Sequence, residues 1–155
     1  MIVRQRRSPV VVVTSSNADG GDPQGLTGSL DSKWTKAWAR TANRLNASKT
    51  RVVYVNDTPW PKGDVPECLA QHPRSVQTCA QSTKRAVGSA RRSMMARAVT
   101  KAGATIVDPM PWFCSLSSCP VVVGNILVYK DDSHISTVYS RLLAPLLSER
   151  LKAKT

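Results

Sequence analysis

The sequence of 155 residues is long enough for one globular domain, and its 41% apolar and 21% charged residues exclude an intrinsically disordered chain. No stretch approaches the roughly 20 apolar residues of a membrane span, and the apolar run Val10–Val13 is shorter than the about 7–15 residues of an export signal. The formal net charge of +12, from 22 Lys and Arg against 10 Asp and Glu, favours an anionic partner.

The first third of the chain predicts a strand, a loop and a helix. Pro9–Ser16 contains a short apolar run of the kind that forms a strand buried on both faces of a parallel sheet. The Gly- and Asp-rich stretch 17–30 predicts a loop. Ser32–Leu45 has the period of a helix, with Trp34 and Trp38 on its apolar face, and we expect both rings in the core.

The middle of the chain predicts a second strand and a long helix, separated by a proline-rich loop. Arg51–Asn56 has the apolar pattern of a buried strand, and Asp57–Pro66 contains three prolines. Gln81–Ala102 predicts one continuous helix, because small and apolar residues recur along one face and basic residues along the other. The apolar face consists of Ala86, Ala90, Met94 and Ala98.

The next segment predicts a third strand followed by irregular structure. Ala104–Asp108 is the third apolar run, and Pro109–Ser118 predicts a loop. Val121–Val128 is expected to be extended or to form a short hairpin, because Gly124 and Asn125 are turn residues.

A final amphipathic helix completes the predicted order of elements. Ile135–Leu151 carries aliphatic residues at helical spacing, and Pro145 is expected to kink or break this helix. Strands and helices alternate, which predicts an α/β fold with a parallel sheet flanked by helices. Three clear strands are few for such a sheet. We therefore expect that a first strand and a first helix are missing and that residues 1–155 form a single, partial domain.

Four cysteines lie in two local pairs, Cys68 with Cys79 and Cys114 with Cys119. Neither pair has the spacing of a zinc site, so no metal or other cofactor is predicted. Two short-loop disulfides fit better and indicate an oxidising compartment. Four cysteines allow three different pairings, and four reduced cysteines remain the alternative. Because no export signal is visible, we expect a longer parent protein to supply the targeting.

The positive charges are scattered rather than gathered into a nucleic-acid-binding motif. They lie near the start, along the predicted helix 81–102 and at the end of the chain. No zinc-finger or RNA-binding signature accompanies them, and the aromatic residues are not interleaved with basic ones, as a base-stacking surface would require. These features argue against a nucleic-acid partner.

The segment Tyr129–Ser136 contains the best candidates for chemistry. Asp131 precedes His134 by three residues, just before the amphipathic helix. On a tight loop, the carboxylate can accept a hydrogen bond from one ring nitrogen and leave the other free to take a proton from a hydroxyl. Short Asp/His combinations are also common in surface polar clusters, so this spacing alone is consistent with either role.

Three features of the sequence resemble the SGNH domain that is fused to membrane acyltransferases of the acyltransferase-3 family. Tyr129–Ser136, followed by an aliphatic helix, is similar to the family's last block with its Asp-x-x-His motif. The segment Asn56–Cys68 resembles the family's Asn-Asp-Thr-Pro-x-Pro and Val-Pro-x-Cys pattern, and the second cysteine pair, with Cys119 before Pro120, matches too. The resemblance covers most of the chain, about residues 9–147.

The resemblance implies a flavodoxin-like, SGNH-type α/β fold and a Ser-His-Asp site for O-acyl transfer or ester hydrolysis on cell-envelope carbohydrate. His134 would be the general base and Asp131 its orienting acid, with Asp132 the rival for that role. Ser16 and Asn17 would lie at the oxyanion-hole position. The implied partners are an acyl donor, a carbohydrate acceptor and an N-terminal membrane acyltransferase domain in a longer parent. The implied location is extracytoplasmic or membrane-associated.

The sequence departs from the family at the nucleophile. The family's serine lies in a Gly-Asp-Ser block that this sequence lacks, and Gly21 and Asp22 are followed by Pro23. The resemblance therefore implies the C-terminal part of such a domain, with impaired activity, because the serine forms the acyl-enzyme. A serine from elsewhere in the chain would make it an esterase in its own right. The alternative function is a non-catalytic basic module that binds an anionic glycan or a membrane surface.

Overall fold

The chain folds into two compact units, each with a hydrophobic core of its own. The computed structural model describes residues 10–14, 29–86 and 90–152. The first unit takes the described residues up to Asp57 and from 90 to Val107. The second unit takes residues 58–86 and 108–152.

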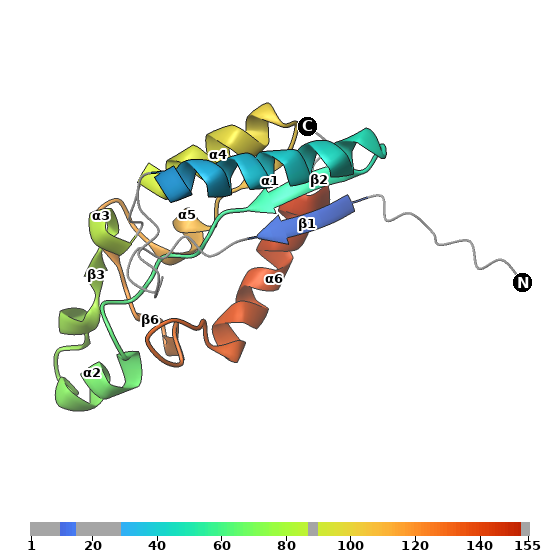
Figure 1. The fold of residues 1–155 in the computed structure, drawn as a ribbon. Coiled ribbons are helices and arrows are strands. Elements are labelled where there is room, and N and C mark those ends of the chain that lie inside the picture. Colours follow the sequence, from blue (N-terminus) through green and yellow to red (C-terminus); the bar gives the residue numbers. More distant parts are fainter. Residues whose placement is uncertain (1–9, 15–28, 87–89, 153–155) are drawn as a thin grey trace, which may run out of the picture. The chain divides into compact units, whose positions relative to one another are not determined.

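The first unit is built around a three-stranded parallel sheet, which confirms the predicted α/β class. Its strands are β1 (Val10–Thr14), β2 (Arg51–Val55) and β4 (Thr105–Val107), in the order β1-β2-β4 (Figure 1). In the central strand, Val53 pairs with Val12 on one side and Thr105 on the other. The three middle side chains of β2 are buried, as is typical of a parallel strand covered on both faces.

Strand β1 is less buried than its apolar sequence predicts. Val12 is 46% exposed, and Thr14 is exposed as well. In the described sheet β1 pairs with β2 alone and therefore lies at an edge. An apolar run thus predicts a strand without fixing its place in the sheet.

Among the described residues of the first unit, two helices accompany this sheet, α1 (Ser29–Ala47) and α4 (Ala90–Lys101). They lie side by side, and α1 contacts β2 while α4 contacts β4 (Figure 1). Trp38 packs edge-on against Tyr54, with ring centroids 5.9 Å apart. Trp34, which we expected in the core, is 40% exposed, because the core cluster begins one turn later, at Trp38.

The prediction of one continuous helix over Gln81–Ala102 is wrong. Gln81–Ser82 forms strand β3, which pairs antiparallel with β5 (Ser118–Cys119). Thr83–Ala86 then forms the short helix α3. Pairing with a segment more than 30 residues away overrides the local helical pattern here.

Helix α4 also buries a different face from the one predicted. Met95 and Val99 are fully buried, whereas Met94 and Ala98 are only half-buried. Burial of Val99 removes more apolar area from water than burial of Ala98 would. The observed rotation of the helix about its axis is therefore more stabilising than the predicted one.

The second unit combines short elements around a core of mixed aromatic and aliphatic residues. Its remaining elements are α2 (Val65–Gln71), η1 (Val76–Cys79), α5 (Met110–Phe113), β6 (Val122–Val123), β7 (Ile126–Leu127) and α6 (Thr137–Lys152). Its core residues are Val65, Cys79, Phe113, Val121, Val128, Tyr129 and Tyr139. Strands β6 and β7 form the short hairpin expected around Gly124, whose φ of +58° suits glycine.

Helix α6 continues through Pro145, where we expected a kink or a break. Tyr139 is buried and Leu143 packs against the core, so the amphipathic pattern correctly predicted this helix. Among the described helices, none is both long enough and apolar enough to cross a bilayer.

Candidate functional site

The candidate site lies on a tight loop of the second unit, residues 130–134, which we call the Asp–His loop. Tyr129 and Ile135 face each other across an antiparallel bridge that closes the loop. Inside this bridge, the Lys130 N–H donates to the carbonyl of His134 at 2.9 Å. The backbone therefore folds back on itself within five residues, which brings the two ends of the Asp-x-x-His motif together.

The Asp131 carboxylate is the centre of this loop. Its Oδ1 accepts backbone hydrogen bonds from His134 N at 2.6 Å and from Ser133 N at 2.9 Å. Its Oδ2 lies 2.8 Å from His134 Nδ1, so the carboxylate and the ring are also in direct contact. An ionised carboxylate can only accept, so the proton of this contact belongs to Nδ1.

The loop also determines the charge of Asp131. The backbone hydrogen bond from His134, followed by that from Ser133, lowers the pKa of Asp131 from 3.8 to about 2, and the His134 ring adds to this effect. Hydrogen bonds to the charged form of a carboxyl favour that form. The group is therefore ionised at neutral pH and is suited to orient a histidine.

His134 keeps one nitrogen available. With Nδ1 bonded to Asp131, the lone pair of Nε2 is free, and Nε2 has no hydrogen-bond partner among the described residues. The side chain is 67% exposed. The structure thus provides an oriented ring with an accessible basic nitrogen, which is the arrangement that a general base requires.

Asp132 and Ser133 differ from Asp131 in their contacts with the His134 ring. Asp132 is exposed and forms neither a hydrogen bond nor an ion pair with His134 in the described part of the chain, so Asp131 is the carboxylate on the ring. Ser133 Oγ lies 3.2 Å from His134 Nδ1, the nitrogen already bonded to Asp131. It is therefore on the wrong side of the ring to give a proton to Nε2.

Ser136 secures the far end of the loop. Its hydroxyl donates to the carbonyl of Leu127 at 2.5 Å and accepts from the N–H of Tyr139 at 3.1 Å. The second contact caps the start of helix α6. Sequence reasoning missed this role, although a Ser directly before an apolar-periodic segment is a recognisable capping signal.

Ser16 and Asn17, the predicted oxyanion-hole residues, lie outside the described residues. The oxyanion hole therefore stays a prediction from the family resemblance.

The four cysteines form two bonded pairs within the second unit. Cys68 is joined to Cys79, and Cys114 to Cys119. Cys79 and Cys119 are buried in or beside the core, so the pairs connect the short helical segments to the packed interior.

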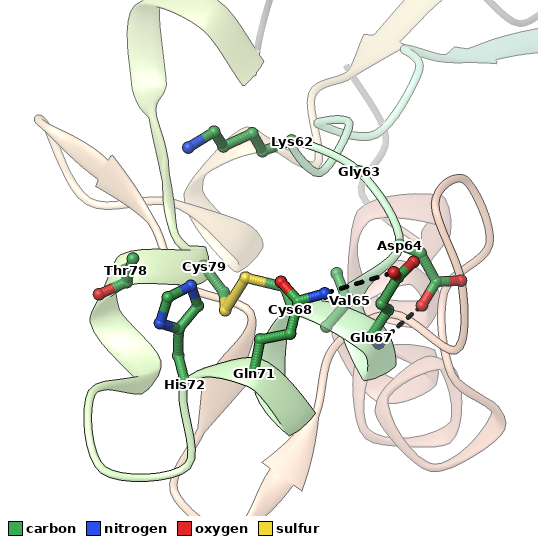
Figure 2. A pocket seen from close by; sticks show the side chains of 10 residues that line it. All are labelled: Lys62, Gly63, Asp64, Val65, Glu67, Cys68, Gln71, His72, Thr78 and Cys79. Atoms are coloured by element: carbon green, nitrogen blue, oxygen red, sulfur yellow. Dashed lines mark hydrogen bonds between the residues drawn. A yellow bond between two sulfur atoms is a disulfide. The ribbon is translucent and has the colours of Figure 1, made fainter.

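A pocket of about 300 Å³ lies beside the Cys68–Cys79 disulfide (Figure 2). Its polar walls are partly bonded to one another: Asp64 accepts from the N–H of Glu67 at 2.8 Å, and Gln71 donates to the Glu67 carboxylate at 3.3 Å. These bonds cap and stabilise α2. None of the lining residues belongs to the Asp–His loop, so this pocket is separate from the candidate site.

The parallel sheet with its flanking helices, and an Asp-x-x-His loop placed just before the last helix, define an SGNH-type α/β domain. A model of the SGNH domain that is fused to AT3 domains matches residues 2–149, and the chain belongs to this family. The match confirms the resemblance inferred from the sequence.

A solved structure shares this fold. It is the periplasmic domain of a lipopolysaccharide acetyltransferase from Salmonella ser. Paratyphi A, with a TM-score of 0.66 over 93% of this chain and 16% sequence identity. The chain spans 57% of the length of that domain, and at this identity the likeness concerns the fold alone. A comparison with curated proteins gives no match.

Proposed function

We propose that this chain contributes the histidine and aspartate of an SGNH-type O-acyl transfer or ester hydrolysis site. The observation that carries this proposal is the Asp131–His134 pair, with the carboxylate 2.8 Å from Nδ1 and with no described residue bonded to Nε2. Membership of the SGNH family supports it, because the family match covers residues 2–149 and thus includes both residues.

In the proposed reaction, His134 Nε2 takes the proton of a serine hydroxyl as the serine oxygen attacks the carbonyl carbon of an acyl donor. The protonated ring then gives this proton to the leaving group, and an acyl-enzyme remains. In the second half, Nε2 takes the proton of the acceptor hydroxyl as its oxygen attacks the acyl-enzyme carbonyl, and the ring gives this proton to the serine oxygen as the ester bond to the serine breaks. Asp131 stabilises the charged ring in both halves.

The proposed role requires a nucleophilic serine. The 155 residues contain no Gly-Asp-Ser, and Ser133 lies against Nδ1 rather than Nε2. We therefore propose that these residues, taken alone, have impaired activity. A serine supplied from outside them would complete the site.

The proposed substrates are an acyl donor and a carbohydrate acceptor of the cell envelope, in a single SGNH-like domain that operates outside the cytoplasm. The structural neighbour is a periplasmic domain of a lipopolysaccharide acetyltransferase, and the family is fused to AT3 domains, which supports a membrane acyltransferase as the parent protein. The two disulfides support an oxidising location.

Hydrolysis of p-nitrophenyl acetate by the purified chain tests the proposal. We expect slow turnover without a burst, since His134 can activate water and no serine in the described part of the chain is bonded to its Nε2. His134→Ala should lower this turnover by on the order of 10²-fold, the lower end of the contribution of a general base. His72→Ala is the matched control, because it removes the other histidine of the chain and should leave the rate unchanged.

Equal rates in wild-type protein and His134→Ala would contradict the assignment of His134. A burst, with an acetyl group found on a serine by mass spectrometry, would instead contradict the proposed lack of a nucleophile.

The second candidate is a non-catalytic basic module for an anionic glycan or a membrane surface. The net charge of +12 favours it.

A further inference from the structure

Tyr129 is the residue at which the Asp–His loop enters the core. Its side chain is 1% exposed, and its ring lies 6.2 Å from that of Phe113, centroid to centroid. Its hydroxyl donates to the carbonyl of Pro59 at 2.8 Å. Burial raises the pKa of Tyr129, with a smaller contribution from Tyr139, so the phenol remains protonated and remains a donor.

The bond from Tyr129 to Pro59 differs from the other contacts that hold the loop. The bridge to Ile135 and the bonds of Ser136 to Leu127 and Val128 all connect residues fewer than ten positions apart. They connect the loop only to itself and to the segment directly before it. The Tyr129 hydroxyl reaches a carbonyl 70 residues away in the sequence.

The acceptor of this bond is itself fixed. Pro59 is fully buried, and the next residue, Trp60, donates its N–H to the carbonyl of Ala86 at 3.1 Å. The Trp60 N–H and the Pro59 carbonyl belong to one planar peptide group, so the bond to Ala86 also restrains the direction of this carbonyl. The Tyr129 hydroxyl is therefore bonded to a rigid point.

We propose that Tyr129 is a positioning residue for His134. By donating its buried hydroxyl to the Pro59 carbonyl, it fixes the first end of the Asp–His loop and thereby the angle at which the Asp131 carboxylate meets the ring. This inference rests on the proposed function only in treating His134 as the base. The placement of the carboxylate can be measured without any activity.

The physical reason is the narrow tolerance of the contacts around Asp131. One carboxylate accepts from two backbone N–H groups and from a ring at distances between 2.6 and 2.9 Å. A rotation of the loop entry would lengthen some of these bonds, and hydrogen bonds weaken steeply as their geometry departs from linear. Orientation of the base would be lost before the loop itself unfolds.

Tyr129→Phe tests this inference, with Tyr139→Phe as a matched control. Tyr139 lies in the same core and donates its hydroxyl to the carbonyl of Trp112 at 2.5 Å, but that bond does not hold the Asp–His loop. Each variant loses one phenol-to-carbonyl hydrogen bond, so both should show a similar fall in melting temperature. A purely structural role for Tyr129 predicts no further difference.

The deciding measurement is the pKa of Asp131, followed by carbon-detected NMR of its carboxyl. We expect Tyr129→Phe to raise this pKa from about 2 toward the ordinary value of 3.8, and Tyr139→Phe to leave it in place. Replacing Tyr129 with p-aminophenylalanine, which keeps an N–H donor at the same position, should restore the wild-type value. This third variant also decides the case if Tyr129→Phe does not fold.

Three outcomes would overturn the inference: an unchanged Asp131 pKa in Tyr129→Phe, an equal rise in both Phe variants, or no restoration by p-aminophenylalanine. If the pKa follows the expected pattern while His134→Ala hydrolyses p-nitrophenyl acetate as fast as wild type, the positioning of the loop stands and the proposed function fails.

Discussion

At the scale of single residues, the Asp–His loop stabilises the charge of one carboxylate by its own backbone. Two N–H groups of Ser133 and His134 point at Asp131, so the carboxylate is ionised and oriented before any substrate arrives. Catalytic groups are commonly prepared in this way, because a preorganised dipole needs no rearrangement during the reaction.

Because of this arrangement, the free energy of unfolding of the second unit should depend on pH at acidic values. The pKa of Asp131 is lowered in the folded state, to about 2 from 3.8, so its stabilising contribution is present above pH 3.8 and is lost as the pH falls through 2. We expect wild type to be more stable than Asp131→Asn at pH 5, and the difference to disappear near pH 2. Urea unfolding of both proteins at several pH values measures this difference.

Asp132→Asn is the control, since Asp132 has no bond to the loop histidine and should change stability little at any of these pH values. A difference between wild type and Asp131→Asn that stays constant from pH 5 to pH 2 would show that the backbone bonds do not favour the ionised form.

The pairing of Asp131 with His134 could be predicted because it is local, spanning three residues on one loop. The bond from Tyr129 to Pro59 could not, because its partners are 70 residues apart and a phenol that donates to a backbone carbonyl leaves no pattern in the sequence. The oxyanion-hole residues Ser16 and Asn17 fall outside the described residues and stay a prediction.

At the scale of helices and strands, the periodicity of apolar residues correctly predicted the elements whose packing partners are nearby in the sequence or whose apolar face is uniform. The three parallel strands and the last helix lie where their apolar patterns place them. The pattern failed at Gln81–Ser82, which forms strand β3 instead of a helix. It also failed to give the buried face of α4, because several of its faces carry alanine or methionine and the packing partner decides between them.

A pair of substitutions distinguishes the predicted face of α4 from the observed one. Met95 is fully buried in the first unit, so Met95→Ala should lower the free energy of unfolding by about 2–5 kcal/mol through the lost burial and the cavity left behind. Met94 is half-buried and its truncation should lower the free energy by clearly less. Urea unfolding measures both, and a larger loss in Met94→Ala would contradict the observed rotation of the helix.

At the scale of the whole molecule, the excess of 12 positive charges is the dominant electrostatic property. Such a charge attracts anionic surfaces over a distance set by the Debye length, which falls from about 30 Å at 0.01 M to about 8 Å at 0.15 M salt. Because the basic residues are scattered along the sequence, we expect this attraction to be general rather than directed at one site.

Sedimentation with lipid vesicles tests this expectation and with it the second candidate function. The chain should bind phosphatidylglycerol vesicles at about 0.01 M salt and lose most of this binding at about 0.15 M, while neutral phosphatidylcholine vesicles bind none. Binding that persists at the higher salt, equally in wild type and His134→Ala, would favour a membrane-binding module over the proposed acyl transfer site.

The two units are interleaved along the chain, and this has a consequence for protein synthesis. The first unit has all its described strands once the ribosome has added Val107, whereas residues 58–86 must wait for the segment 108–152 before their shared core can form. Cys68 and Cys79 thus emerge well before Phe113 and Tyr139, their later core partners. A nascent chain would therefore pass through a stage in which the three described strands can pair while residues 58–86 still lack their core partners, and this segment is then most open to proteases.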